Sequence, residues 1–485
     1  MTMALALNWI NGEWVDSGHH KDSINPATYE VIGQYADATH EDAENAIAAA
    51  KYAFKNTVWK DDRLLRARVL NEMADLFDQY YDELVLLLST ENGKVKAEAE
   101  LEVGMVANKL RYSASLVRTE YGRALEPKAG SFSIVLREPM GVAGVIAPWN
   151  SPVVLMIRSL APALAAGTTT VVKLPSQTAQ VNALLSKIFS EVKSLPKGVI
   201  NVVTESGSAA SKLLIESPDV PVISFTGSSG TGEAISRVGA DNIKRFGLEL
   251  GGKTPMIVFN DANLDEALPK LEKSLTVFAG QFCMTGSRLL VQRGIAEELT
   301  KRLAERLENV KLGPASDLSS DMGPLIDKPN VERVNGMVEK AIADGAKVIV
   351  RGGPVTEGPL AKGAFYRPTL LQVTDPNADI VQKEVFGPVL SLLIFDTEAE
   401  AVELANNSEY GLAASIWTQD VNRPLRVARE ISAGTIWIND WAVIYDEFEE
   451  GGYKKSGLGR MNGVAAMDDF IEYKHITITT GVIEK

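Results

Sequence analysis

Apolar and polar positions follow two different periods along the chain, and each period predicts a different kind of element. In the first 120 residues, apolar side chains recur at the spacing of amphipathic helices. This spacing predicts helices over residues 41–55, 61–91 and 97–121, the second closed by Asn92-Gly93. Before them, the segment 9–15 predicts a short hairpin that turns at Asn11-Gly12.

Compact apolar runs replace this pattern after residue 141. Strands are predicted at 142–146, 169–172, 199–203, 222–225 and 256–259, with helices beginning near Val153, Gln177, Gly207 and Ser229. A second series follows, with strands at 289–291, 348–350, 389–395, 413–417 and 434–438 and helices at 296–309, 330–344, 398–407 and 423–431. Apolar strands that alternate with crossover helices are typical of doubly wound parallel sheets, which bind ligands at the carboxyl ends of their strands. The sequence therefore predicts an α/β fold with two such domains.

Two isolated segments alternate apolar and polar side chains in the manner of half-exposed antiparallel strands. They cover residues 131–137 and 474–479. Neither segment has a neighbouring strand in the sequence that would complete a stable sheet. We therefore expect a protruding β element that pairs with a second copy of the chain, in a homodimer or a homotetramer.

Composition narrows the classes of partner. The chain has 485 residues, more than one hydrophobic core usually supports. Its 49 Lys and Arg against 63 Asp and Glu give a net charge of -14, which disfavours nucleic acid and anionic membranes as partners. The first residues lack a basic segment followed by an apolar run, and no stretch reaches the ~20 apolar residues of a membrane span. These features predict a cytoplasmic protein.

Histidine and cysteine are scarce. The four histidines are neither spaced as metal ligands nor placed beside a candidate nucleophile, which disfavours a histidine-bound metal and a Ser-His-Asp hydrolase. The single cysteine, Cys283, excludes an internal disulfide and a cysteine-based metal site. We therefore predict no metal.

Cys283 lies in a turn between a predicted helix that ends at Gly280 and a predicted strand that begins at Arg288. A lone cysteine is often a small buried apolar residue. A turn between two regular elements, however, also holds a side chain rigidly while leaving it reachable. Composition alone leaves both interpretations open.

Polar, glycine-rich loops follow the predicted strands of the first domain. Residues 226–232 offer backbone N–H groups and a helix cap, Ser228, to an anion, although they are not a dinucleotide fingerprint. Glu249 lies between leucines beside Gly251-Gly252. It is either paired with Lys253 or a desolvated carboxyl with a raised pKa, which is what a general base near neutral pH requires.

Six segments together resemble the NAD(P)-dependent aldehyde dehydrogenase superfamily. They occur in the family's order and are Pro148-Trp149-Asn150, 171–176 with Lys173, 225–228, 248–253, 280–288 with Cys283, and 383–388. The resemblance implies oxidation of an aldehyde to a carboxylic acid. Cys283 would be the nucleophile, Glu249 the base, and the Asn150 amide with the Cys283 N–H would bind the oxyanion; hydride transfer to nicotinamide leaves a thioester that water cleaves.

The resemblance also implies an architecture. It assigns residues 1–120, 141–250 and 441–459 to a discontinuous NAD(P)-binding domain, 251–440 to the catalytic domain, and 121–140 with 460–485 to oligomerisation strands. Cofactor contacts are expected from Trp149, Lys173, Ser176, Gly207, Phe225, Gly227, Ser228, Leu250, Glu384 and Phe386. Many relatives carry glutamate at the position of Ser176, where it repels a 2′-phosphate. The serine predicts that NADP is accepted as well as NAD.

The substrate is the least determined feature. Candidate substrate residues are Arg158, Ser151, Phe282, Thr285 and Glu450. Arg158 stands where some relatives that act on acidic semialdehydes or aryl aldehydes carry arginine; it pairs either with a substrate anion or with Glu450. A second arginine of the semialdehyde relatives is replaced by Val277, which favours an aryl or medium-length aldehyde.

Three other functions compete with this prediction. The first is a semialdehyde dehydrogenase whose acidic substrate is held by Arg158. The second is an acylating relative that passes the thioester to coenzyme A, against which Glu249 argues because such relatives typically lack this base. The third is a non-catalytic binding or structural member of the family.

Overall fold

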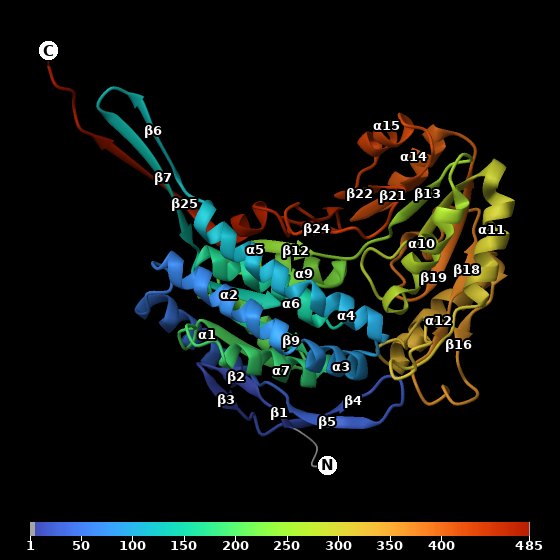
Figure 1. Cartoon of the computed structure of the whole chain (residues 1–485), viewed down its shortest axis with the longest axis horizontal. Helices are drawn as coiled ribbons and strands as arrows, with labels where there is room; N and C mark the ends of the chain where they lie inside the picture. The colour runs from blue at the N-terminus through green and yellow to red at the C-terminus, as the bar shows by residue number, and fades with distance from the viewer. Residues whose placement is uncertain (1–4, 485) are drawn as a thin grey trace.

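Two large β-sheets organise the computed structural model, which describes residues 5–484. In Figure 1 they occupy the two halves of the molecule, with helices on both faces. The first sheet has the order β24-β12-β11-β8-β9-β10-β2-β3 and the second β15-β18-β19-β14-β13-β21-β22. The predicted α/β class with two doubly wound parallel sheets is therefore confirmed.

The first sheet is built from β24 (Gly457–Leu458), β12 (Arg245–Glu249), β11 (Val222–Thr226), β8 (Val142–Ile146), β9 (Thr169–Pro175), β10 (Ile200–Glu205), β2 (Asn8–Ile10) and β3 (Glu13–Val15). Its helices are α1 (His40–Asn56), α2 (Arg63–Gln79), α3 (Tyr81–Asn92), α4 (Lys96–Gly104), α5 (Val106–Thr119), α6 (Pro152–Ala166), η1 (Ser176–Thr178), α7 (Ala179–Ser190), α8 (Ala209–Glu216), α9 (Ser229–Gly239) and η2 (Ala240–Asn242). Every residue of α6 is buried, so this helix forms the centre of the core on one face of the sheet.

The second sheet is built from β15 (Lys347–Val350), β18 (Thr369–Gln372), β19 (Val389–Phe395), β14 (Arg288–Gln292), β13 (Pro255–Val258), β21 (Ala413–Trp417) and β22 (Thr435–Ile438). Its helices are α10 (Leu264–Thr276), η3 (Val277–Gly280), α11 (Arg293–Glu308), α12 (Lys328–Ala343), α13 (Asp379–Gln382), α14 (Glu398–Asn406) and α15 (Arg423–Glu430). Smaller elements complete the chain: β1 (Leu5–Ala6), β4 (His20–Ile24), β5 (Val31–Ala36), β16 (Gly353–Pro354), β17 (Tyr366–Arg367), β20 (Tyr410–Gly411) and β23 (Tyr453–Lys454).

The predicted hairpin is confirmed and two predicted helices are divided. β2 and β3 pair across Asn11 and Gly12, both with positive φ, as a two-residue hairpin requires. The single helix predicted over 61–91 is two helices, because Tyr80 leaves helical geometry between α2 and α3. The helix predicted over 97–121 is likewise divided into α4 and α5, at Gly104 and Met105. Apolar spacing continues across both breaks, so the sequence pattern could not locate them.

The prediction that placed the strand at 256–259 in the first series is wrong. That strand, β13, lies in the second sheet between β14 and β21. The corresponding place in the first sheet belongs to β12, which the prediction missed because Arg245 and Gly247 interrupt its apolar run. β18 was missed as well. The chain therefore crosses from one sheet to the other within residues 250–254, the segment that contains Gly251-Gly252.

The division into three domain segments remains a proposal, and the sheets support it. The boundary at residue 250 falls between β12 and β13, and β24, from the C-terminal part of the chain, pairs with β12 in the first sheet. The first residues of the proposed range, 1–4, lie outside the described part, as does residue 485.

The two isolated strands lie side by side. β7 (Ser131–Pro139) and β25 (Ile471–Thr479) pair antiparallel along their whole length, and β6 (Arg123–Lys128) lies on the other edge of β7. The short helix η4 (Ala465–Phe470) leads into β25. This three-stranded flap projects from the body, at the upper left of Figure 1. Its cross-strand pairs Phe132–Ile478 and Ile134–Ile476 keep apolar side chains on one face.

Among residues 5–484, no helix combines the length and the apolar composition that crossing a membrane needs.

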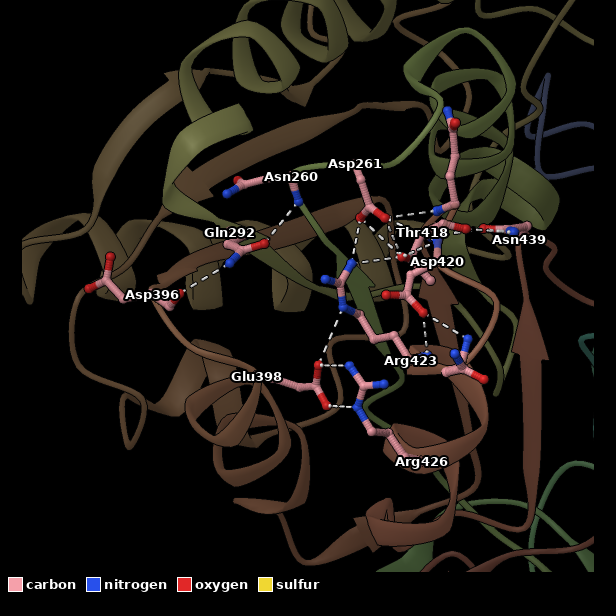
Figure 2. Close-up of polar contacts among 12 residues, drawn as sticks. Asn260, Asp261, Gln292, Asp396, Glu398, Thr418, Asp420, Arg423, Arg426 and Asn439 are labelled. Carbon is pink, nitrogen blue, oxygen red and sulfur yellow. Dashed lines mark hydrogen bonds and ion pairs between the residues drawn. The ribbon is translucent and has the colours of Figure 1, made fainter.

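Asp261 ties together the loops that follow β13 and β21. Its carboxylate accepts hydrogen bonds from the Thr418 hydroxyl and from the backbone N–H groups of residues 419 and 420, and it pairs with Arg423 at 2.7 Å. Arg423 also reaches Glu398, which pairs with Arg426 (Figure 2). This network lies at the carboxyl ends of the second sheet, and its internal pairing indicates a structural latch rather than a ligand site.

Replacing Asp261 by alanine is expected to lower the free energy of unfolding by about 1–3 kcal/mol, because several donors then lose a charged acceptor. Chemical denaturation followed by circular dichroism measures this effect. Asp241→Ala, at an exposed position, is the matched control and should change stability by less than about 0.5 kcal/mol. Equal effects of the two substitutions would show that the latch contributes nothing.

Candidate active site

A cavity of about 320 Å³ opens where the two sheets meet. Nine of the predicted site residues line it: Trp149, Asn150, Gly227, Ser228, Glu249, Leu250, Cys283, Glu384 and Phe386. They come from the carboxyl ends of β8, β11 and β12, from the turn before β14, and from the segment after α13. Pro148, Leu155, Thr226, Gly251 and Arg333 complete the wall. The structure therefore brings together the three predicted catalytic residues.

The turn that holds Cys283 begins with strained backbone. Phe278 and Ala279 have φ of 52° and 54°, in the left-handed region that side chains other than glycine rarely adopt. The Phe278 N–H donates to the buried Glu98 carboxylate at 2.9 Å, which fixes the unusual conformation. Cys283 itself is half-buried and faces the cavity. The thiol is thus both held and reachable, as a nucleophile requires.

A buried lysine ties this turn to the start of α6. Lys94 donates to the Glu102 carboxylate and, at 2.9 Å, to the Ser151 hydroxyl, and its ammonium lies over the Phe278 ring. Glu102 accepts from the backbone N–H groups of Val153 and residue 154 in the first turn of α6. This network was not predicted, because its members are far apart in the sequence and no local pattern marks them.

Asn150 is held against the nucleophile turn by its own side chain. Its Nδ2 donates to the Gln281 carbonyl at 3.0 Å, two residues before Cys283. The Gln281 side chain in turn donates to the Phe278 carbonyl and accepts from the Ile326 N–H. The amide that is predicted to bind the oxyanion is therefore fixed against the turn that carries Cys283. Asn92 adds a further bond to the Trp149 carbonyl at 2.6 Å.

Glu249 ends β12 with its backbone fixed and its carboxyl unpaired. Its carbonyl accepts from the Gly227 N–H at 3.0 Å. Within residues 5–484, neither Glu249 Oε1 nor Lys253 Nζ has a hydrogen-bond partner, so the interpretation that Lys253 caps this carboxyl is wrong. Burial raises the pKa of Glu249 to about 7; among nearby charges, Arg158 lowers it and Glu450 raises it. A carboxyl that titrates near neutral pH can both take up and release a proton.

Burial also raises the pKa of the Cys283 thiol, to about 12, with Arg158 acting in the opposite direction. At neutral pH the thiol is therefore protonated, and a neighbouring base has to remove its proton before it can attack a carbonyl. Glu249 lines the same cavity.

Two glycines bring Glu384 and Cys283 close to the crossing between the sheets. The Glu384 carboxylate accepts from the Gly252 N–H at 3.1 Å. A Cβ on Gly251 would lie about 2.5 Å from that carboxylate, and one on Gly252 would lie about 2.5 Å from the Cys283 carbonyl. Larger residues would separate these groups, which explains the double glycine.

Two aromatic side chains form another part of the cavity wall. The rings of Trp149 and Phe386 meet edge to face at 5.5 Å between centroids. Phe386 has φ of 52°, and Arg333 of α12 donates to the carbonyls of residues 385 and 386, which holds this strained backbone. Arg333 was not predicted, because nothing in its helix distinguishes it from an exposed arginine.

The predicted residues that do not line the cavity are Lys173, Ser176, Gly207, Phe225, Arg158, Ser151, Phe282, Thr285 and Glu450. Lys173 and Ser176 lie at the carboxyl end of β9, beside β8. Gly207 follows β10 and is exposed. The Ser151 hydroxyl accepts a hydrogen bond from Lys94, and the Thr285 hydroxyl donates one to the Gly280 carbonyl. Phe282 packs edge to face on Phe278 and Trp441.

The sequence pattern of the aldehyde dehydrogenase family matches residues 14–476. The chain belongs to this family. This match agrees with the resemblance seen in the sequence. It also means that the cavity lined by Cys283, Glu249 and Asn150 lies in a member of the aldehyde dehydrogenase family.

Individual aldehyde dehydrogenases match over nearly the whole chain. Betaine aldehyde dehydrogenase of Bacillus subtilis (strain 168) is 38% identical over 472 residues, 96% of each protein. The crystal structure of betaine aldehyde dehydrogenase from Staphylococcus aureus in complex with NAD+ has a TM-score of 0.96 at 35% identity, over 98% of this chain and 95% of that one. An NAD-dependent aldehyde dehydrogenase from Sinorhizobium meliloti has a TM-score of 0.95 at 37% identity, over 100% and 96%.

Proposed function

We propose that this chain oxidises an aldehyde to a carboxylic acid with NAD+ or NADP+, through a thioester on Cys283. The observation that carries the proposal is the convergence of Cys283, Glu249 and Asn150 on one cavity that Glu384 and Phe386 also line. A nicotinamide dinucleotide, when bound, supplies the acceptor for the hydride that leaves the aldehyde carbon.

The chain's own residues account for the remaining steps. Glu249 takes the thiol proton, so that the sulfur can attack the aldehyde carbon. The Asn150 amide and the Cys283 N–H stabilise the oxyanion, and loss of one such donor typically costs ~3 kcal/mol in the barrier. After hydride loss, Glu249 activates the water that cleaves the thioester. A carboxyl with a pKa near 7 suits both proton transfers.

The residues present fit a dinucleotide. Gly227 and Ser228 place the N-terminus of α9 on the cavity wall, where a pyrophosphate is favoured. Glu384 is half-buried, with a carboxylate able to accept hydrogen bonds from ribose hydroxyls, and desolvation raises its pKa to about 7. Lys173 and Ser176, at the end of β9, would contact the adenosine ribose, and Trp149 and Phe386 would contact the nicotinamide side.

A steady-state assay tests the proposal. Aliphatic, aryl and acidic aldehydes are offered with NAD+ and NADP+, with and without coenzyme A, and reduced cofactor and acid product are measured. We expect reduced cofactor and free acid in equal amounts without coenzyme A. A requirement for coenzyme A would favour the acylating alternative, and no reduction with any aldehyde would favour a binding or structural role.

Ser176 makes the cofactor preference testable. Without a carboxylate at this position, we expect kcat/KM with NADP+ to lie within about tenfold of that with NAD+ or above it, because Lys173 attracts the 2′-phosphate. Ser176→Glu should lower kcat/KM with NADP+ by about tenfold or more, since it places a like charge against that phosphate. Ser176→Gln, which has similar size without the charge, is the matched control. An NADP+ activity that Ser176→Glu leaves intact would contradict this assignment.

The flap predicts assembly with a second copy of the chain, as a homodimer or a dimer of dimers. Phe132, Ile134, Ile476 and Ile478 share one face of the flap, and three of them are more than a third exposed in the single chain. We expect the double substitution Phe132→Asp with Ile478→Asp to shift the protein to monomer in analytical ultracentrifugation, because charges at an apolar interface are strongly disfavoured. Thr477→Asp, on the opposite face, should not. An unchanged oligomer in the double variant would exclude the flap as the interface.

The substrate is proposed to be an aryl or medium-length aldehyde. Leu155 lines the cavity, and Phe282, Trp441 and Val443 belong to the same apolar cluster as Cys283, which suits an apolar substrate body. Because the Arg158 guanidinium can pair with a substrate carboxylate, an acidic semialdehyde is the alternative substrate.

A further inference from the structure

Arg158 and Glu450 face each other in the interior without completing their hydrogen bonds. Arg158 Nη1 lies 3.7 Å from Glu450 Oε2, and the two side chains are only 7% and 6% exposed. Among residues 5–484, Arg158 Nε and Nη2 and both Glu450 carboxylate oxygens have no hydrogen-bond partner. Buried donors and acceptors are normally paired, because an unpaired one costs about 1–3 kcal/mol. The unpartnered atoms of Arg158 and Glu450 therefore indicate a binding site for a polar group of a ligand.

The pair lies near the catalytic cavity. Arg158 follows Leu155, a cavity residue, by three positions on α6, which places both on one face of the helix. Arg158 also lines a small second cavity of about 20 Å³. The charges of Arg158 and Glu450 act in opposite directions on the pKa of Glu249, which burial raises. Both side chains are thus close to the catalytic groups.

Within the described part of the chain, neighbouring groups do not form hydrogen bonds with the Arg158 and Glu450 side chains, and the Glu450 backbone is held in place. The nearby cation Lys109 is already bonded to Asp446 at 2.6 Å and to the Asn462 side chain at 3.0 Å. The Glu450 backbone exchanges two hydrogen bonds with that of Met461, at 2.7 and 2.8 Å, so the carboxylate is carried on a fixed chain.

Cys283 belongs to an apolar cluster that also holds two aromatic side chains. These are Phe282 and Trp441, whose rings meet edge to face at 5.9 Å. The Trp441 indole donates to the Met284 carbonyl at 2.9 Å, which fixes this ring. An aromatic, apolar cluster next to the reacting residue suits a flat ring whose polar group lies at the end away from the reacting carbonyl.

We propose that Arg158 and Glu450 together bind the hydroxyl group of a neutral hydroxyaryl aldehyde, at the end of the ring opposite the carbonyl. The hydroxyl donates to Glu450 and accepts from Arg158, which gives each partner a hydrogen bond. A carboxylate in that place pairs with Arg158 but is repelled by Glu450, and a quaternary ammonium is attracted by Glu450 but is repelled by Arg158 and has no hydrogen to donate. This inference rests on the proposed function and names its substrate class.

Steady-state kinetics with four para-substituted benzaldehydes test it: 4-hydroxy, 4-methyl, 4-carboxy and 4-trimethylammonio. We expect kcat/KM for the 4-hydroxy compound to exceed that for each of the others by about 100-fold or more, since a site built for a hydroxyl rejects analogues that lack one. Preference for the carboxylate, the ammonium or the methyl compound overturns the inference.

Two variants assign the preference to the pair. Glu450→Gln, which keeps the shape of the side chain, should reduce the ratio of kcat/KM between the 4-hydroxy and 4-methyl compounds by about tenfold. The double variant Arg158→Met with Glu450→Gln removes both charges, so no buried ion is stranded, and should bring the ratio close to one. Arg237→Met, at an exposed position of α9, is the control. An unchanged ratio in the double variant overturns the inference.

A binding measurement separates this inference from the proposed function. Calorimetry of the wild-type enzyme with 4-methylphenol and with toluene needs no turnover. Tighter binding of the phenol, lost in the double variant, supports the hydroxyl site even if no aldehyde is oxidised, in which case only the proposed function falls. Equal binding of the two compounds, together with active oxidation of benzaldehyde, overturns the hydroxyl site and leaves the proposed function intact.

Discussion

Cys283→Ser is expected to lower kcat for aldehyde oxidation by roughly 10⁴-fold or more, since removal of a covalent nucleophile abolishes the step on which the others depend. The serine hydroxyl has the size of the thiol but is far harder to ionise beside a base whose pKa is about 7. Stopped-flow absorbance at 340 nm measures both the first turnover and the steady state. We expect neither to be detectable above the uncatalysed rate.

Cofactor binding and thermal unfolding of the Cys283→Ser variant are the controls, because both should match the wild type. Cys283 is the only cysteine in the sequence, so alkylation of the wild type with iodoacetamide provides a second test: one label per chain should remove all activity. Retention of more than about a hundredth of the activity in either experiment would contradict the role of Cys283.

Glu249→Gln is expected to lower steady-state kcat by about 10²–10⁴-fold, the usual contribution of a general base. The substitution keeps the shape of the side chain, so the loss reports proton transfer rather than packing. Because the carboxylate is the active form and its pKa is about 7, wild-type kcat/KM should rise tenfold per pH unit below pH 7 and level off above it. This ascending limb should disappear in Glu249→Gln.

In the variant, the rate should instead continue to rise with pH, because the thiol, with a pKa of about 12, then ionises only through hydroxide. Glu233→Gln, a half-buried carboxyl of α9 that does not line the cavity, is the matched carboxylate control and should retain the wild-type profile. An unchanged limb near pH 7 in Glu249→Gln would assign the titration to another group, and the buried Glu450 would be the next candidate.

Local patterns in the sequence were sufficient wherever neighbouring residues determine the structure. Asn11-Gly12 adopts the positive φ values of a two-residue hairpin, and the glycine-flanked turn between a helix and a strand places Cys283 as predicted. Glu249, wedged between two leucines, is indeed buried and unpaired. In each case a few adjacent residues determine the backbone conformation and the exposure of the side chain.

The sequence patterns did not predict features that depend on contacts between distant segments. Breaks at Tyr80 and Met105 interrupt helices whose apolar spacing continues. β12 was missed because Arg245 and Gly247 interrupt its apolar run, and its pairing with β11 and β24 makes it a strand. The side chains that position the site were missed for the same reason: Lys94 and Arg333 act on turns far from them in the sequence.

The most direct test of the account is the chemical state of Cys283 during turnover. Wild-type enzyme is mixed with aldehyde and NAD+ or NADP+, quenched with acid within the first turnover, and examined by intact mass and peptide mapping. We expect an acyl group on Cys283, with the mass of the aldehyde less two hydrogen atoms, in equal amount to the reduced cofactor. Reduced cofactor formed without any adduct on Cys283 would contradict it.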